Sequence, residues 1–84
     1  MLSVEFSNPA KRFLKKLDLK DSQRLIEKIE LLATKPFPKD VKRVVNRKEK
    51  VFRIRVGEYR ILYVVLYERD LLFIADIDKR PRVY

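Results

Sequence analysis

The chain has 84 residues and contains neither cysteine nor histidine, which excludes disulfides, thiolate metal sites and the usual general base at neutral pH. Lys and Arg number 21 against 12 Asp and Glu, a formal net charge of +9, so an anionic partner is expected. The length suits a single domain, residues 1–84, with no targeting segment and no apolar run near the ~18 residues of a membrane span. A soluble cytoplasmic protein without metal or small-molecule cofactor is predicted.

The N-terminal third predicts a strand and a helix. Residues 2–6 alternate apolar and polar side chains, as a half-buried strand does. Asn8 followed by Pro9 is typical of a helix N-cap with proline at the first helical position. Apolar residues then recur at helical spacing as far as Leu17.

A second helix is expected to begin within Asp18 to Asp21 and to run to about Thr34. Pro36 and Pro38 end this helical region, because each lacks an amide donor and restricts the residue before it. The two helices therefore form an αα-hairpin. The apolar stripe of the second helix comprises Leu25, Ile26, Ile29, Leu32 and Ala33.

From residue 41 onward the pattern changes to that of an antiparallel meander of strands. The predicted fold is α+β, with the N-terminal strand and two-helix hairpin packed on one face of a mostly antiparallel sheet of about four or five strands. The other face of the sheet stays open. The strand-like segments are 41–45, 51–56, 59–67 and 71–78.

Basic residues concentrate on these strands: positions 42 to 60 hold eight Lys and Arg against two Glu. If Gly57-Glu58 is a two-residue type II′ turn, Arg55 faces Arg60 and Arg53 faces Leu62. The arginines then share the open face. The opposite, helix-covered face receives Phe52, Ile54, Val56, Ile61 and Tyr63.

A five-residue turn before the second of these strands would pair Arg43 with Arg53 and add a fourth arginine to the open face. Like charges placed opposite one another destabilise a sheet by up to roughly 1 kcal/mol, so a compensating group is expected. One possibility is a bound anion, because the arginine fork suits phosphate or carboxylate oxygens.

The other possibility is pairing of the arginines with Asp76 or Asp78 on the last strand. An even loop near residues 68–70 turns these two carboxylates toward the helices, whereas an odd loop turns them toward the arginines. The sequence leaves this register open.

The segments FRIRVGEYRILYVV and IADIDKRPRVY, within this order of elements, resemble the RelE/ParE superfamily of toxin–antitoxin toxins, most closely its RelE-like ribonuclease branch. The resemblance implies a toxin that enters the ribosomal A site and cuts mRNA without a metal, and a short RelB-like antitoxin that masks its basic surface. By position it implies catalytic roles for Arg55, Arg60, Arg80 and Tyr84. The residues expected to bind RNA are Arg43, Arg53, Lys79 and Arg82.

The chain departs from the superfamily pattern where Arg53 and Arg55 replace lysines, one of which is commonly given the role of general base. An arginine is effectively never neutral, so the identity of the base is open. Attack of a ribose 2′-OH on the adjacent phosphate needs a proton acceptor, cations and a proton donor for the departing 5′ oxygen. The arginines suit the electrostatic part, and Tyr84 and Lys79 are the proton-transfer candidates.

Two other functions are compatible with the sequence. A ParE-type toxin inhibits DNA gyrase by binding and needs no catalytic residues. A degenerate toxin or plain RNA-binding module would bind in a salt-dependent way and release no product. The arginine cluster and the tyrosine at position 84 favour the ribonuclease over the gyrase inhibitor. The arginines in place of the expected lysines keep the degenerate or RNA-binding alternative open.

Overall fold

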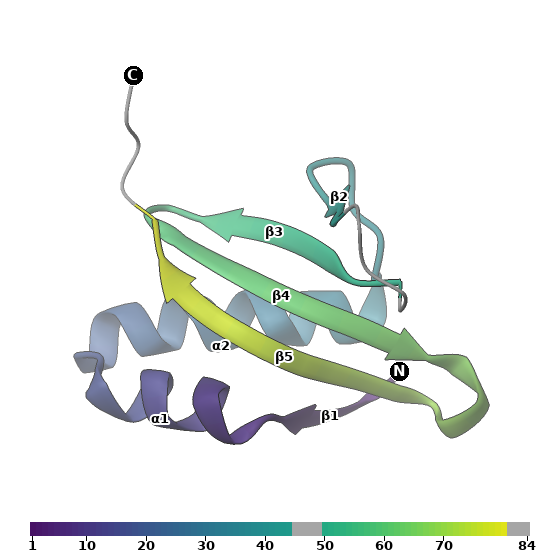
Figure 1. The fold of residues 1–84 in the computed structure, drawn as a ribbon, viewed down its shortest axis with the longest axis horizontal. Helices are drawn as coiled ribbons and strands as arrows, with labels where there is room; N and C mark the ends of the chain where they lie inside the picture. Colours follow the sequence, from purple (N-terminus) through teal and green to yellow (C-terminus); the bar gives the residue numbers. More distant parts are fainter. Residues whose placement is uncertain (45–49, 81–84) are drawn as a thin grey trace.

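The computed structural model describes residues 1–44 and 50–80. The two helices lie on one side of a twisted sheet, with α2 behind the long strands β4 and β5 in the view of Figure 1. This is the predicted α+β architecture. In chain order the elements are β1 (Ser3–Phe6), α1 (Asn8–Lys16), α2 (Leu19–Thr34), β2 (Lys42–Arg43), β3 (Phe52–Val56), β4 (Tyr59–Leu66), a 3₁₀ turn (Tyr67–Arg69) and β5 (Leu71–Lys79).

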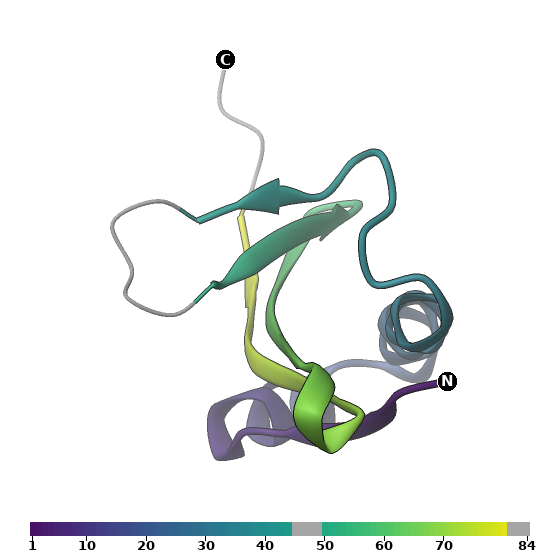
Figure 2. The same cartoon turned by 90° about the vertical axis from the view of Figure 1, so that its right-hand side faces the viewer.

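The sheet has five strands in the order β1-β5-β4-β3-β2. The strand β1 runs parallel to β5, and every other neighbouring pair is antiparallel. Seen from the side, β2 and β3 lie at one border of the sheet and β1 at the other (Figure 2). The prediction of a mostly antiparallel sheet of four or five strands is confirmed. Within the described residues, no helix is long and apolar enough to cross a membrane.

Helix α1 begins one residue earlier than predicted, because its N-cap is Ser7 and not Asn8. The Ser7 hydroxyl accepts a hydrogen bond from the Ala10 amide at 3.2 Å, while Asn8 and Pro9 form the first helical positions. The same hydroxyl donates to the carbonyl of Ala75 on β5 at 2.7 Å. Ser7 thus caps the helix and also binds it to the sheet, which explains why the helix starts there.

Helix α2 begins within the predicted interval. Its N-cap is Asp18, whose carboxylate accepts a hydrogen bond from the Asp21 amide at 2.8 Å. The helix ends at Thr34, shortly before Pro36. Of the predicted apolar stripe, Ile26 is only half-buried. The buried residues of the helix are Leu25, Ile29, Leu32 and Ala33.

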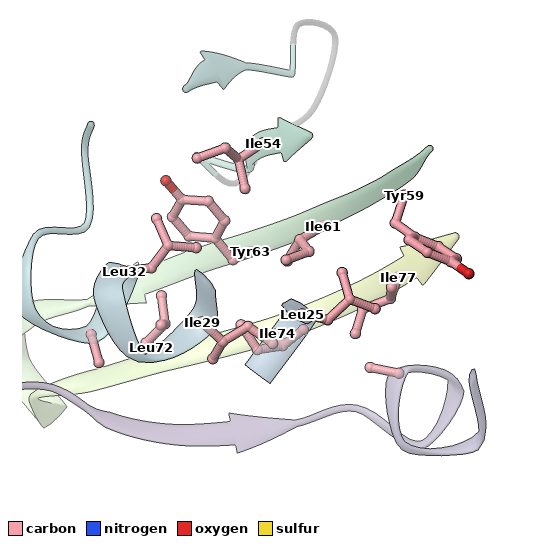
Figure 3. Packing of buried hydrophobic residues seen from close by; sticks show 12 residues of the cluster. Leu25, Ile29, Leu32, Ile54, Tyr59, Ile61, Tyr63, Leu72, Ile74 and Ile77 are labelled. Atoms are coloured by element: carbon pink, nitrogen blue, oxygen red, sulfur yellow. The ribbon is translucent and has the colours of Figure 1, made fainter. Parts of the chain in front are cut away.

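The hydrophobic core lies between the helices and the sheet (Figure 3). Leu25, Ile29 and Leu32 of α2 meet a set of inward-facing sheet residues, and burial of each such side chain contributes roughly 1.5–3 kcal/mol. Phe52 and Val56 are partly buried and pack against this cluster, so the predicted core face is confirmed. The fully buried sheet residues are Ile54, Ile61, Tyr63, Leu72, Ile74 and Ile77.

Strands β3 and β4 pair in the predicted register, with Arg55 opposite Arg60 and Arg53 opposite Leu62. Their turn has Gly57 at φ 60°, and Glu58 is not in the positive-φ region. This combination matches a type II′ turn, in which only the first central residue has positive φ.

The predicted pairing of Arg43 with Arg53 is wrong. Lys42 lies opposite Arg53, and Arg43 lies opposite Phe52. The connection between the strands is even in length, whereas the predicted pairing requires an odd one, and a change of one residue turns every side chain to the other face. Lys42 therefore joins the arginines, whereas Arg43 is on the other side of β2.

The hairpin of β4 and β5 changes register halfway along its length. Leu66 pairs with Leu71, and this even register holds as far as Tyr63 opposite Ile74. Beyond a β-bulge, Leu62 faces Asp76 and Arg60 faces Asp78. The four-residue turn alone would direct both carboxylates to the helices, but the extra residue, Ala75, reverses their orientation.

Candidate nucleic-acid interface

The bulge brings Asp78 against Arg60 on the open face of the sheet. The Arg60 guanidinium donates from Nε to Oδ1 at 3.2 Å and from Nη2 to Oδ2 at 2.8 Å. Arg80 lies near the same carboxylate, its Nε 3.7 Å from Oδ2. One carboxylate thus contacts two of the arginines predicted to act in the site, and compensates part of the repulsion between Arg55 and Arg60.

Lys42, Arg53 and Arg55 line a hollow at strands β2 and β3. Its remaining lining residues are Asp40, Ile54 and Gly57. Together with the pair at Arg60 and Arg80, these side chains give one basic surface across β2 to β5. We call this set the cation cluster: Lys42, Arg53, Arg55, Arg60 and Arg80.

The β3–β4 turn holds the strand ends that carry the cation cluster. The Arg80 amide donates to the Glu58 carbonyl at 2.7 Å, and the Lys79 ammonium lies 3.4 Å from the Glu58 carboxylate. On the helix side, Nη2 of Arg24 lies 2.8 Å from where a Cβ on Gly57 would stand. The positive φ favours glycine at the turn, whereas the flexible end of Arg24 could move aside.

A hydrogen bond also fastens the N-terminal end of α2 to this end of the sheet. The Tyr59 hydroxyl donates to the Asp21 carboxylate at 2.7 Å. This bond, with burial and the negative charge of Asp21, raises the pKa of Tyr59 to about 12. The ring of Tyr59 also meets that of Phe13 edge to face, with centroids 5.9 Å apart, so both helices support the strand that carries Arg60.

A family model described as "ParE toxin of type II toxin-antitoxin system, parDE" matches residues 4–84 of the chain. The chain belongs to the RelE/ParE superfamily of toxins. The candidate toxin RelE1 of Methanocaldococcus jannaschii is 35% identical over 85 residues, which cover 98% of this chain and 93% of that protein.

Two crystal structures of toxin–antitoxin complexes are similar to this RelE/ParE chain in fold. A chain of the RelE–RelB complex of Pyrococcus horikoshii OT3 gives a TM-score of 0.82 at 23% identity, over 98% of both chains. A chain of the RelBE2 complex of Mycobacterium tuberculosis gives 0.78 at 28% identity, over 94% of this chain and 98% of that one. The predicted superfamily and RelE-like fold are confirmed.

Not every residue implied by the superfamily resemblance lies in the cation cluster. Lys79 is exposed beside Glu58, and Arg43 is on the other side of β2. Tyr84 and Arg82 lie outside the described residues. The roles predicted for these four remain predictions.

Sequence reasoning missed Lys42 as a neighbour of the arginines, and it named Asp78 only as one alternative whose face it left open. The signal for Asp78 was present in the core pattern of β5, where Leu72 and Ile74 are two residues apart but Ile77 follows three residues later. Such a break in an alternating strand marks a bulge. For Lys42 no comparable signal exists, because the parity of the connection to β3 decides its face.

The rest of the open face carries mainly apolar side chains and adjoins the cation cluster. Leu62, Val64, Leu66 and Phe73 line a shallow hollow there, with Val51, Ala75, Asp76 and Pro9 around it. Within the described part of the chain, no three acidic side chains gather as metal ligands would. The open face therefore offers guanidinium and ammonium donors at one end and aliphatic surface at the other.

Proposed function

We propose that this protein is the toxin of a toxin–antitoxin pair and cuts mRNA on the ribosome as an endoribonuclease. The observation that carries the proposal is the cation cluster, assembled on one open sheet face from three neighbouring strands and the residue that follows β5. Such an enzyme needs cations that bind the phosphates of its substrate and stabilise the charge that develops during cleavage. It would act in the cytoplasm, where mRNA is translated.

In the proposed reaction, the ribose 2′ oxygen attacks the adjacent phosphorus and the bond from phosphorus to the 5′ oxygen breaks. The products are a 2′,3′-cyclic phosphate and a free 5′-hydroxyl. Arg55, Arg60 and Arg80 would stabilise the additional negative charge on the phosphate oxygens in the transition state. Arg53 would hold a neighbouring phosphate.

Proton transfer needs other groups, since an arginine cannot release its proton at neutral pH. Tyr84 is the first candidate for the acceptor of the 2′-OH proton or the donor to the 5′ oxygen, and Lys79 is the second. Lys42 is a third, because its register opposite Arg53 puts a lysine beside the arginines. A lysine can exchange a proton in a role for which an arginine is unsuited.

The proposed partner is a short antitoxin that covers the cation cluster with acidic side chains. The related RelE chains of P. horikoshii and M. tuberculosis were crystallised in complexes with their antitoxins. A net charge of +9 favours an acidic partner through charge complementarity. Binding there would block access of RNA to the same guanidinium groups.

The proposal can be tested with Arg60→Ala in a primer-extension assay on mRNA, with and without translating ribosomes. The wild type should give ribosome-dependent cuts, and the variant should cut about a hundredfold or more slowly, the usual effect of losing one charge-stabilising group. Arg69→Ala is the matched control, because it removes the same charge from the exposed turn at the far end of the β4–β5 hairpin.

A thermal unfolding scan of each variant separates loss of the site from loss of the fold. If folded wild-type protein leaves mRNA intact on translating ribosomes, the ribonuclease proposal is wrong. If Arg60→Ala and Arg69→Ala cut mRNA equally fast, Arg60 has no catalytic role, even though the protein is a ribonuclease.

Inhibition of DNA gyrase is the second candidate function, because the family model that matches the chain is described by the name ParE. Such a toxin would use the same fold and basic surface for binding alone. Trapped gyrase–DNA complexes in the presence of the protein, without any cut mRNA, would favour this function. Salt-dependent RNA binding without a product would instead favour a plain RNA-binding protein.

A further inference from the structure

We propose that Asp78 is a positioning residue that holds Arg60 and Arg80 toward one phosphate group. The inference rests on the proposed ribonuclease function and adds to it a carboxylate that neither binds RNA nor takes part in proton transfer. Three features support it: the contacts of Asp78, the guanidinium donors that these contacts leave free, and the bulge that brings Asp78 to this face.

The contacts of Asp78 use only one edge of the Arg60 guanidinium. Its two oxygens accept from Nε and Nη2 at 3.2 and 2.8 Å, whereas a guanidinium has five N–H donors in a fixed plane. Of the three remaining donors, one on Nη1 and one on Nη2 form a second edge. That edge can still make two parallel hydrogen bonds to a phosphate, which is the geometry an arginine fork favours.

The second contact brings Arg80 to the same carboxylate. Nε of Arg80 lies 3.7 Å from the Oδ2 atom that also accepts from Arg60. The Arg60 side chain is only 18% exposed, while that of Arg80 is 58% exposed. Asp78 therefore lies between a restrained guanidinium and a freer one, and keeps both within reach of one anion.

Repulsion explains why such a carboxylate is needed. Arg55 lies directly opposite Arg60 on the neighbouring strand, and Arg80 approaches from the end of β5. Without a negative charge among them, these three cations would repel one another, and flexible side chains would move apart into solvent. A carboxylate at the centre allows the positive charges to remain close in the absence of substrate.

The backbone is built to deliver Asp78 to this position. The bulge at Ala75 turns Asp78 from the core side to the open side of β5, and Ser7 donates a hydrogen bond to the Ala75 carbonyl at 2.7 Å. An ordinary surface ion pair would be worth little and would need no such support. Here Ser7, the N-cap of α1, holds the carbonyl of the bulged residue Ala75, and the bulge places Asp78 opposite Arg60.

A purely electrostatic role for Asp78 leads to the opposite expectation for its removal. Loss of one negative charge would make the cation cluster more basic, so RNA would bind more tightly and cleavage would be at least as fast. A positioning role predicts that binding is kept or improved while cleavage is lost. The two roles can therefore be separated by measuring binding and cleavage on the same variant.

The test uses Asp78→Asn, which keeps the shape of the side chain and removes its charge. We expect ribosome-dependent cleavage to fall between about tenfold and about a hundredfold, the cost of misplacing reacting groups by a small distance, with RNA affinity unchanged or higher. Asp70→Asn, with the same charge change at the exposed turn beyond Arg69, should cleave like the wild type. Asp78→Glu should recover part of the lost rate.

A variant cycle links the effect to the two arginines. If Asp78 acts through Arg60 and Arg80, adding Asp78→Asn to the double variant Arg60→Ala with Arg80→Ala should not slow cleavage further. A further loss in that background, or wild-type cleavage by Asp78→Asn alone, would overturn the positioning role.

A binding measurement tests Asp78 even in a protein that cuts nothing. A short RNA with 2′-O-methyl groups, which cannot be cleaved, is added to the ¹⁵N-labelled protein, and the Nε–H signals of Arg60 and Arg80 are followed by NMR. In the wild type both signals should shift on saturation with RNA, and in Asp78→Asn the shift of at least one should be smaller. Wild-type protein that binds this RNA but leaves mRNA intact on translating ribosomes would refute the ribonuclease, whereas the same two shifts in Asp78→Asn as in the wild type would refute the positioning role.

Discussion

Two inward-facing tyrosines of β4 show how single hydroxyl groups tie the helices to the sheet. The Tyr59 hydroxyl donates to Asp21 at the start of α2, and the Tyr63 hydroxyl donates to the Pro36 carbonyl just beyond its end. The bond to Asp21 raises the pKa of Tyr59 to about 12, and burial also raises the pKa of Tyr63 above its ordinary value. Both phenols thus stay protonated in the folded protein at pH values where a free tyrosine ionises.

The stability of the protein should therefore fall in alkaline solution. Tyrosines of the unfolded chain lose their protons near pH 10, while folded Tyr59 keeps its proton to about pH 12. Between these values the unfolded state binds fewer protons, so the free energy of unfolding decreases as pH rises. In Tyr59→Phe this decrease should be smaller, because Tyr63 alone then contributes to it.

Urea unfolding between about pH 8 and about pH 11, the range around the tyrosine pKa, measures this effect. Tyr67→Phe is the comparison, since Tyr67 is 62% exposed in the 3₁₀ turn and its loss should change the pH dependence less than the loss of the Tyr59 hydroxyl does. Identical curves for Tyr59→Phe and the wild type would contradict the role given to the bond with Asp21.

At the scale of elements, Ser7 joins three parts of the fold. Its amide donates to the Ile74 carbonyl at 2.9 Å, and its hydroxyl both caps α1 and donates to the carbonyl of Ala75. The joint between β1 and α1 is thereby fixed against the bulged part of β5. A short polar side chain thus controls where a helix begins and supports the irregular step in the sheet.

Ser7→Ala should lower the free energy of unfolding by about 1–2 kcal/mol, the cost of removing an N-cap and of leaving a carbonyl unpaired. The comparison variant is Ser3→Ala, which changes an exposed serine on β1 and should alter stability by less than about 0.5 kcal/mol. Chemical denaturation of both variants measures the difference. A Ser7→Ala protein as stable as Ser3→Ala would show that the hydroxyl contacts contribute little.

The elements that the sequence predicts well are those with local signals. The boundaries of α2 follow from Asp18 and Pro36, and the β3–β4 register follows from a turn whose glycine fixes both its type and its length. The β2–β3 register could not be predicted in this way, because hydrophobic alternation gives the faces of a strand only once the parity of its connection is known. Because this parity was unknown, the prediction placed Arg43 in the site where the structure has Lys42.

The residues of the site were likewise predictable only in part. Arg53, Arg55 and Arg60 follow from alternation and a single turn, whereas the contact between Asp78 and Arg60 depends on a bulge in β5. Alternation counts residues as if every one were paired, so it gives the wrong face beyond any unpaired residue. The sequence named Asp78 as a possible partner of the arginines, but the pairing of β4 with β5 was needed to decide which face it takes.

At the scale of the whole molecule, two surfaces carry several basic side chains each. The cation cluster occupies the open face of the sheet, and exposed basic residues such as Arg12 and Lys16 lie on α1. Only the first surface combines several strands and a bound carboxylate. We therefore expect RNA to contact the sheet face and to leave the outer face of α1 in solvent.

The salt dependence of RNA binding can distinguish these surfaces. Arg55→Ala removes one group that we expect to bind a phosphate, so it should reduce the slope of log affinity against log salt by roughly 0.7, the value for a single-stranded nucleic acid. Arg12→Ala removes the same charge from α1 and should leave the slope nearly unchanged. Fluorescence anisotropy with a labelled single-stranded RNA gives both slopes, and equal reductions would mean that total charge, not the sheet face, governs binding.

The bulge at Ala75 also decides how this strand must be compared with its relatives. A homologous strand without the extra residue would have to carry its apolar side chains one position out of phase after Ile74 to keep its core. An alignment without a gap there would match buried positions with surface positions, and would hide any carboxylate equivalent to Asp78. Placing one gap at Ala75 restores the correspondence, so the length of a single strand segment determines which residues of two toxins can be compared.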